Sequence, residues 1–370
     1  MAKSRITTTN TDIDYWDSYI GGYIYHNNNT GDALTTQISD GRKMHFTSLL
    51  WLWLDPGTLA VQTLVQTPID TNGYSAGNLA VVQANTNEQY ALFSEAFGIP
   101  SALDNMCASA VARTNAVTYM VNFVTTNNLT GIDLNCEQSF NLNAVRYNNF
   151  KLFVQQLTTA LHAVGKKIII TQAGFFFEQP IWNEEDLVTT IGVDYYNIML
   201  YDYHWYGANN NPNNTPLMSD EYAIESVYWT QAKMGANAHK LMAAIPNYGY
   251  YANQNATQAN IGSSQVSNIH LNTMSTLPGF GTSTRPAVLI NGTNIYRDTY
   301  GSTISPSWER HWVNGGRAYW YQDSTSMNHK RRLLESLNVK HIIVWHLGGG
   351  NPWFSIKKER AFGSITGNII

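Results

Sequence analysis

Residues 129–137 carry three polar side chains at a spacing that could support acid–base chemistry. Apolar and polar residues alternate there, which predicts a β-strand whose polar face carries Asp133, Asn135 and Glu137. Burying two carboxyls and an amide without partners is costly, so this face should line a cavity or a surface. The opposite face is apolar and should pack against helices; it carries Ile132, Leu134 and Cys136.

Strand-like and helix-like segments alternate along the chain, and this alternation predicts the fold that positions the polar face. Strands are expected at residues 20–25, 45–54, 89–93, 129–137, 166–173, 193–203, 241–246 and 339–347. Helices are expected at residues 104–127, 143–165, 184–190, 219–234 and 324–337. Apolar strands that alternate with helices indicate an α/β protein of parallel βα units, and eight such units close as a (β/α)8 TIM barrel.

The rival architecture is an open doubly wound sheet, which would need a Gly-rich turn after its first strand. Gly21 and Gly22 instead lie inside the first expected strand. The active site of a barrel lies at the carboxyl ends of its strands. Glu137, Tyr201 and Trp345 all lie at such ends.

One segment interrupts the expected barrel. Residues 250–315 are rich in Ser, Thr, Asn and Gly and break the rhythm, so we predict a small inserted lobe after the seventh strand. The barrel domain would then comprise residues 19–249 and 316–358. An N-terminal arm (1–18) and a C-terminal tail (359–370) would flank it, and residues 57–85 have no clear pattern.

Composition excludes several classes of function. The 370-residue chain has a formal net charge of −4 and no broad basic face, so we expect no nucleic-acid partner. We expect neither a membrane span nor a secretory signal peptide, because the apolar runs are too short and the N-terminus is polar. No paired spacing of His or Cys indicates a metal site or a cofactor, and Cys107 and Cys136 should be buried apolar residues. The 22 Tyr and 11 Trp suit stacking on sugar rings or a large aromatic core.

Several short motifs together resemble one enzyme family. Residues 131–137, Gly-Ile-Asp-Leu-Asn-Cys-Glu, resemble the D-G-x-D-x-D-x-E signature of family 18 glycoside hydrolases, the chitinases and endo-β-N-acetylglucosaminidases. Residues 199–202 (Met-Leu-Tyr-Asp) are similar to the family's M-x-Y-D on the sixth strand, and residues 246–249 to its P-x-Y-G after the seventh. Gly22 and Tyr23 match its first-strand G-Y, and Trp345 stands where the family has a tryptophan on the eighth strand.

The resemblance implies a role for each matching residue. Glu137 would be the general acid and base, and the substrate's own 2-acetamido group would attack the anomeric carbon with retention and without a metal. Asp133 would support Glu137, Tyr201 would hydrogen-bond the acetamido carbonyl, and Asp202 would tune the acid. The substrate-binding set would be Trp345, Tyr248, Tyr23, Met199 and Gln172, with packing as the alternative role for several of them.

Two positions depart from the family pattern. Thr130 replaces the first, mostly structural acid, and Asn135 replaces the middle aspartate close to the mechanism. We therefore expect a chitinase-like glycosidase that cleaves β-1,4 links at N-acetylglucosamine in chitin, peptidoglycan or an N-glycan core. The alternative is a chitinase-like lectin or structural protein without turnover, for example one assembled into a larger particle. Such substrates are extracellular, so action outside the producing cell or on a particle is expected.

Overall fold

The structure is a computed structural model, and it describes fourteen segments of the chain. These are residues 19–24, 44–67, 71–95, 100–136, 144–174, 183–202, 220–246, 249–253, 267–269, 288–290, 293–295, 310–314, 317–321 and 324–347. Two predicted site residues, Glu137 and Tyr248, lie outside the described residues, as do the predicted arm at 1–18 and tail at 359–370.

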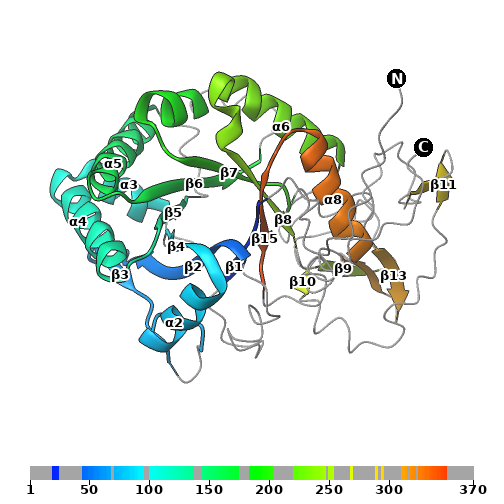
Figure 1. The fold of residues 1–370 in the computed structure, drawn as a ribbon, viewed down its shortest axis with the longest axis horizontal. Coiled ribbons are helices and arrows are strands. Elements are labelled where there is room, and N and C mark those ends of the chain that lie inside the picture. The colour runs from blue at the N-terminus through cyan, green and yellow to red at the C-terminus, as the bar shows by residue number, and fades with distance from the viewer. Residues whose placement is uncertain are drawn as a thin grey trace, which may run out of the picture.

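Eight parallel strands within the described residues close into a barrel (Figure 1). In spatial order they are β1 (Tyr19–Ile24), β2 (Met44–Leu54), β4 (Thr86–Ser94), β5 (Gly131–Asn135), β6 (Lys167–Ala173), β7 (Tyr195–Met199), β8 (Leu241–Pro246) and β15 (His341–Trp345). Pairing of β1 with both β2 and β15 closes the ring. The predicted (β/α)8 TIM barrel is confirmed, and all eight strands lie close to the expected positions.

Helices surround the barrel, and most were expected where they are found. They are α2 (Ala76–Asn85), α3 (Pro100–Ala108), α4 (Ala110–Thr126), α5 (Ala144–Ala163), α6 (Asp220–Met234) and α8 (Ser324–Ser336), with the short helices η2 (Asp186–Ile191) and η3 (Gly235–Lys240). In Figure 1, α3, α4 and α5 lie outside the ring of strands.

The prediction of one continuous helix over 104–127 was wrong, because Ser109 divides it into α3 and α4. Ser109 has an extended backbone, and its side chain accepts a hydrogen bond from the backbone N–H of Ala112, which caps α4. Residues 57–85, which had no clear pattern, form the short strand β3 (Val61–Thr63), antiparallel to β2, and the helix α2.

Strand alternation divides the buried side chains into two sets. The outward set packs under the helices and includes Ile132, Leu134 and Cys136, as expected for the apolar face of residues 129–137. Cys107 and Cys136 are both buried, which was also expected. The inward set fills the barrel and includes Tyr23, Ile169 and Met199. Because the period of a strand is two, the polar residues of β5 face this inner set.

Charged and aromatic residues close the end of the barrel opposite the carboxyl ends of the strands. Lys167 Nζ lies 2.6 Å from Glu88 Oε1 and 5.6 Å from the centre of the Tyr195 ring. The His341 ring lies 4.9 Å from the Tyr195 ring and stacks on Tyr19 at 5.1 Å, centre to centre. Burial lowers the pKa of His341 to about 4, which keeps this ring neutral near pH 7.

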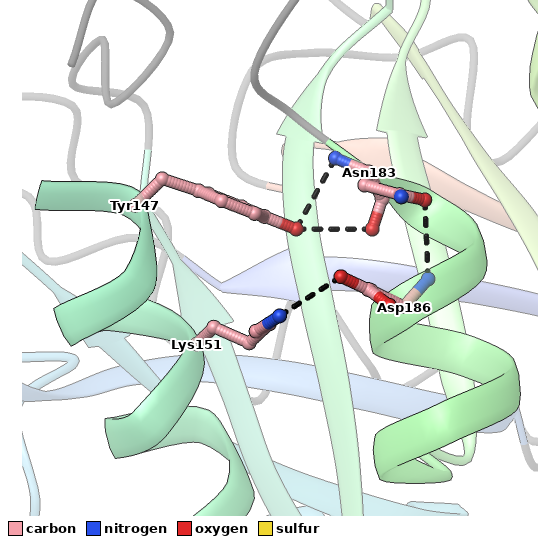
Figure 2. Close-up of polar contacts among 4 residues, drawn as sticks. All are labelled: Tyr147, Lys151, Asn183 and Asp186. Carbon is pink, nitrogen blue, oxygen red and sulfur yellow. Dashed lines mark hydrogen bonds and ion pairs between the residues drawn. The ribbon is translucent and has the colours of Figure 1, made fainter. Parts of the chain in front are cut away.

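Helix α5 is joined to the segment that precedes β7 by a small polar cluster (Figure 2). The Tyr147 hydroxyl donates to the backbone oxygen of Asn183 at 3.0 Å and accepts from its N–H at 3.1 Å. Lys151 Nζ lies 3.0 Å from Asp186 Oδ2, and the Asn183 side chain accepts from the N–H of Asp186. These contacts fix the start of η2 against α5 and so help to set the path into β7.

A second, antiparallel sheet is built from β9 (Gly249–Asn253), β10 (Ser267–Ile269), β13 (Arg310–Asn314) and β14 (Arg317–Tyr321). The strands β11 (Val288–Ile290) and β12 (Thr293–Ile295) form a separate antiparallel pair. These strands lie between β8 and β15 in the sequence, where the inserted lobe was expected. The exact domain bounds stay a prediction.

Candidate active site

The carboxyl of Asp133 is the centre of a polar network inside the barrel. Asp133 lies on β5 and has no exposed surface. Thr171 Oγ1 on β6 donates to Asp133 Oδ1 at 2.6 Å, and Ser48 Oγ on β2 donates to Oδ2 at 2.7 Å. The Tyr23 hydroxyl on β1 hydrogen-bonds the same carboxyl and lies 3.1 Å from Thr171 Oγ1. Side chains from three other strands, β1, β2 and β6, therefore satisfy this buried acid.

Burial and hydrogen bonding act on Asp133 in opposite directions. Removal from water raises the pKa of the carboxyl from its ordinary 3.8 to about 6, while the bonds from Thr171, Ser48 and Tyr23 hold the pKa down. Above about pH 6 the site therefore contains a buried negative charge that faces the lumen. Such a charge favours positive charge that develops nearby during a reaction.

Asn135 lies one step further along the same face of β5, at the carboxyl end of the strand. Its neighbours across the sheet are Ser94 on β4 and Thr171 on β6, and its side chain is buried. Two residues later the sequence reaches Glu137, which is outside the described residues. The predicted polar face of this strand is thus present in Asp133 and Asn135, and the position of Glu137 stays a prediction.

Four other predicted site residues lie together in the inner set of side chains. Tyr23 and Met199 are buried, Tyr201 and Trp345 are half-buried, and all four belong to the same inner cluster. The Trp345 ring lies 5.1 Å from the Tyr23 ring in an edge-on arrangement, and the peptide bond after Trp345 is cis. This group lies near the carboxyl ends of the barrel strands, where Asn135 also lies.

Asp202 follows β7 in a left-handed backbone conformation, with φ 58°. Few residues other than glycine adopt this conformation, although Asp tolerates it better than most. Such conformations gather at active sites, where the surrounding structure stabilises them. Asp202 lies three residues after Met199, the last residue of β7, and is half-buried.

Comparison with known proteins decides the family. A family model described as "Glycosyl hydrolases family 18" matches residues 98–350, more than half of the chain. The chain belongs to glycoside hydrolase family 18. None of the curated proteins searched matches the sequence.

Solved structures of chitinases and of a chitinase-like agglutinin share the fold at low sequence identity. A chitinase from Chromobacterium violaceum is 17% identical with a TM-score of 0.68, and the match covers 94% of this chain and 99% of that one. A tobacco class V chitinase variant in complex with NAG4 is 18% identical, with a TM-score of 0.66 and coverage of 94% and 99%. A chitinase-like agglutinin from Robinia pseudoacacia is 17% identical, with a TM-score of 0.65 and coverage of 93% and 99%. By family and fold the protein is a chitinase-like glycosidase.

Gln172 is the predicted site residue that the structure does not bring to the others. Its neighbours in β6, Thr171 and Ala173, follow the inward alternation, whereas Gln172 pairs with the outward-facing Ile198. Gln172 is fully buried, and its Oε1 accepts a hydrogen bond from the N–H of Ala173 at 3.1 Å. On this strand it is Thr171 that contacts Asp133.

Sequence reasoning missed three residues of the polar network around Asp133, namely Ser48, Thr171 and Asn197. Each is a small polar residue inside an otherwise apolar strand, and alternation could have assigned it to the lumen. The signal was weak because their hydrogen-bond partners lie on other strands, which come together only when the barrel closes.

Two other kinds of site are absent from the described residues. No group of three or more His, Cys, Asp and Glu there could hold a metal ion. Within the same segments, none of the helices combines the length and the apolar character that a membrane crossing requires.

Proposed function

We propose that this family 18 protein cleaves β-1,4 links at N-acetylglucosamine by substrate-assisted catalysis, with Glu137 as general acid and base. The observation that supports the proposal best is the Asp133 carboxyl, which three hydroxyls hold in the lumen of the barrel. A buried charge so well supported, on the strand that leads to Glu137, is what a mechanism with a cationic intermediate requires. The family of the chain favours the same reaction.

Each residue has a distinct part in this mechanism. Glu137 protonates the leaving oxygen, the acetamido oxygen attacks the anomeric carbon, and Glu137 then activates the water that opens the oxazolinium ring. Tyr201 hydrogen-bonds the acetamido group, and Asp202 tunes the pKa of Glu137. Asn135 accepts the acetamido N–H through its side-chain oxygen, where the family has a carboxylate.

The aromatic residues suit the apolar face of a sugar. Trp345 is half-buried and rests edge-on against Tyr23, so one side of its ring is already packed within the protein. We propose that Trp345 forms the floor under the N-acetylglucosamine ring, with Met199 and Tyr248 beside it. The chitinase from tobacco that binds NAG4 supports a glycan of this type as the ligand.

Turnover of a fluorogenic chitotrioside tests the proposal. The parent chain should release the fluorophore and give a product of retained configuration, and Glu137→Gln should reduce the rate at least about 100-fold. The matched control is Glu185→Gln, a change of the same chemistry at an exposed glutamate of η2, which should leave the rate unchanged. Equal rates for the parent chain and Glu137→Gln would refute the proposed mechanism.

The second candidate function is that of a lectin or a particle-associated structural protein. Two observations favour it: Asn135 replaces a mechanistic carboxylate, and a chitinase-like agglutinin shares the fold. Calorimetric titration with chitotriose separates the two functions, because a lectin would bind the sugar tightly and return it intact. We expect the protein to act outside the producing cell under either function.

A further inference from the structure

Asn197 is a fully buried amide on β7 that has no part in the mechanism described so far. Its Nδ2 donates to the Tyr23 hydroxyl at 2.7 Å and to Thr171 Oγ1 at 3.1 Å. Both acceptors are the hydroxyls that serve Asp133. Asn197 therefore lies one hydrogen bond behind the carboxyl, on the strand that precedes Tyr201 and Asp202.

The direction of these bonds follows from the number of protons available. An amide nitrogen can only donate, so at both contacts the hydroxyl oxygen is the acceptor. Each hydroxyl has a single proton, and because Asn197 does not use it, that proton remains available for Asp133. Thr171 indeed donates its proton to Asp133 Oδ1 at 2.6 Å.

The reverse orientation of the amide would have the opposite effect. The side-chain oxygen of Asn197 would then accept from Tyr23 and Thr171, and their protons would be drawn away from the carboxyl. Asp133 would keep Ser48 as its donor from this set, which is a poor environment for a buried negative charge. Among the described residues, the side-chain oxygen of Asn197 has no hydrogen-bond partner in the observed orientation.

We propose that Asn197 is a positioning residue, which fills the acceptor sites of Tyr23 and Thr171 and thereby directs both hydroxyl protons onto Asp133. Its catalytic consequence rests on the proposed function, whereas its effect on Asp133 does not. Three donors favour the ionised carboxylate, so loss of the amide should raise the pKa of Asp133 above its present value of about 6.

Two variants of Asn197 separate the effect of hydrogen bonding from that of charge. Asn197→Leu removes the donor, keeps the same branching and number of side-chain heavy atoms, and frees both hydroxyls to rotate away. Asn197→Asp keeps the shape but introduces a carboxylate, which competes for the same protons and repels the charge on Asp133. The pKa of Asp133 should therefore rise in the order parent, Asn197→Leu, Asn197→Asp.

Carbon-13 NMR of the aspartate carboxyls measures this directly, with Asp133→Asn used to assign the signal. We expect a rise of about one pH unit or more in the midpoint for Asn197→Asp. The matched control is Ile198→Val, the next residue on β7, which faces the helices and should leave the midpoint unchanged. An unchanged midpoint in both Asn197 variants, or an equal shift in Ile198→Val, would overturn the proposal.

Activity supplies an independent readout. In the proposed reaction, the acid limb of the kcat/KM profile should move to higher pH together with the NMR midpoint in each Asn197 variant. A midpoint that moves while the acid limb stays fixed would overturn the catalytic part of the proposal. If the parent chain has no turnover, the proposed function fails, and the NMR titration still decides whether Asn197 positions the hydroxyl protons.

Discussion

Ser48 donates a 2.7 Å hydrogen bond to Asp133, although β4 lies between the strands that carry the two residues. The bond therefore spans the inner face of the barrel and does not follow the sheet. It places the Asp133 carboxyl at a height where β1, β2 and β6 can all reach it. The charge of this carboxyl, and thus its pKa of about 6, has consequences that can be measured.

Asp133 should make the folded protein less stable as the pH rises from about 4 to 6. The folded protein keeps the proton of Asp133 up to about pH 6, whereas an unfolded aspartate releases it near pH 3.8. The stabilisation is complete below pH 3.8 and is lost as the pH rises to about 6. Relative to the parent chain, Asp133→Asn should therefore gain about 1.4 kcal/mol of unfolding free energy per pH unit in this window. Urea unfolding at several pH values measures the difference, and a flat difference curve would contradict it.

His341 should have the opposite effect in nearly the same window. Its pKa is about 4 in the folded protein and 6.5 ordinarily, so the unfolded chain binds a proton that the folded protein excludes. The stabilisation is complete above pH 6.5 and is lost as the pH falls to about 4. His341→Phe keeps a ring between Tyr19 and Tyr195 but removes this titration. Its stability relative to the parent chain should rise by about 1.4 kcal/mol per unit as the pH falls.

The two effects oppose each other, so the parent chain should show little pH dependence from this pair between about pH 4 and 6. The double variant Asp133→Asn, His341→Phe should likewise show little change in slope relative to the parent chain. A slope in the double variant that matches either single variant would show that one of the two groups does not titrate as described.

Asn135→Asp should raise kcat about tenfold or more if the missing carboxylate limits the rate, since a charged partner stabilises a developing cation better than an amide. Steady-state kinetics with a chitotrioside measure the change. Asn122→Asp, the same substitution at an exposed position of α4, is the control and should have no effect. An unchanged or lower kcat in Asn135→Asp would show that the missing carboxylate does not limit the rate.

Gly131→Ala should destabilise the protein by about 3 kcal/mol, because added atoms in a tightly packed region displace the backbone. A Cβ at Gly131 would lie 1.9 Å from the backbone oxygen of Lys167 on the neighbouring strand. Gly77→Ala is the control, since a Cβ there meets only Ser75 Oγ, at 3.9 Å, and the residue lies in α2. This control should be neutral or slightly stabilising in urea unfolding, as expected for glycine in a helix.

The sequence was sufficient to predict the barrel because periodicity acts over short distances. The alternation in residues 129–137 correctly assigned Asp133 and Asn135 to one face and Cys136 to the other. The hydrogen-bond network that supports the Asp133 carboxyl could not be predicted in the same way. Tyr23 is 148 residues from Thr171 and 174 residues from Asn197, and no local pattern relates residues so far apart.

The position of Gln172 on the outer face of β6 could not be predicted for a related reason. A polar residue near the end of an apolar strand is easily assigned to the site, but a displacement of one residue reverses the face. The register of β6 against β5 pairs Thr171 with Asn135 and therefore sets which residue faces the lumen. That register depends on the neighbouring strand as well as on the residues of β6 itself.

The close approach of Gly131 to Lys167 shows that residues of the signature motif can be constrained for different reasons. The glycine is required by the spacing of two adjacent strands, so any descendant that keeps this barrel must keep it, whether or not it turns over a substrate. In the proposed mechanism Glu137 is required by the reaction instead, so we expect its identity to follow catalysis. Under the proposed mechanism, we expect the glycine to be retained with the barrel and the acid to be retained with hydrolysis.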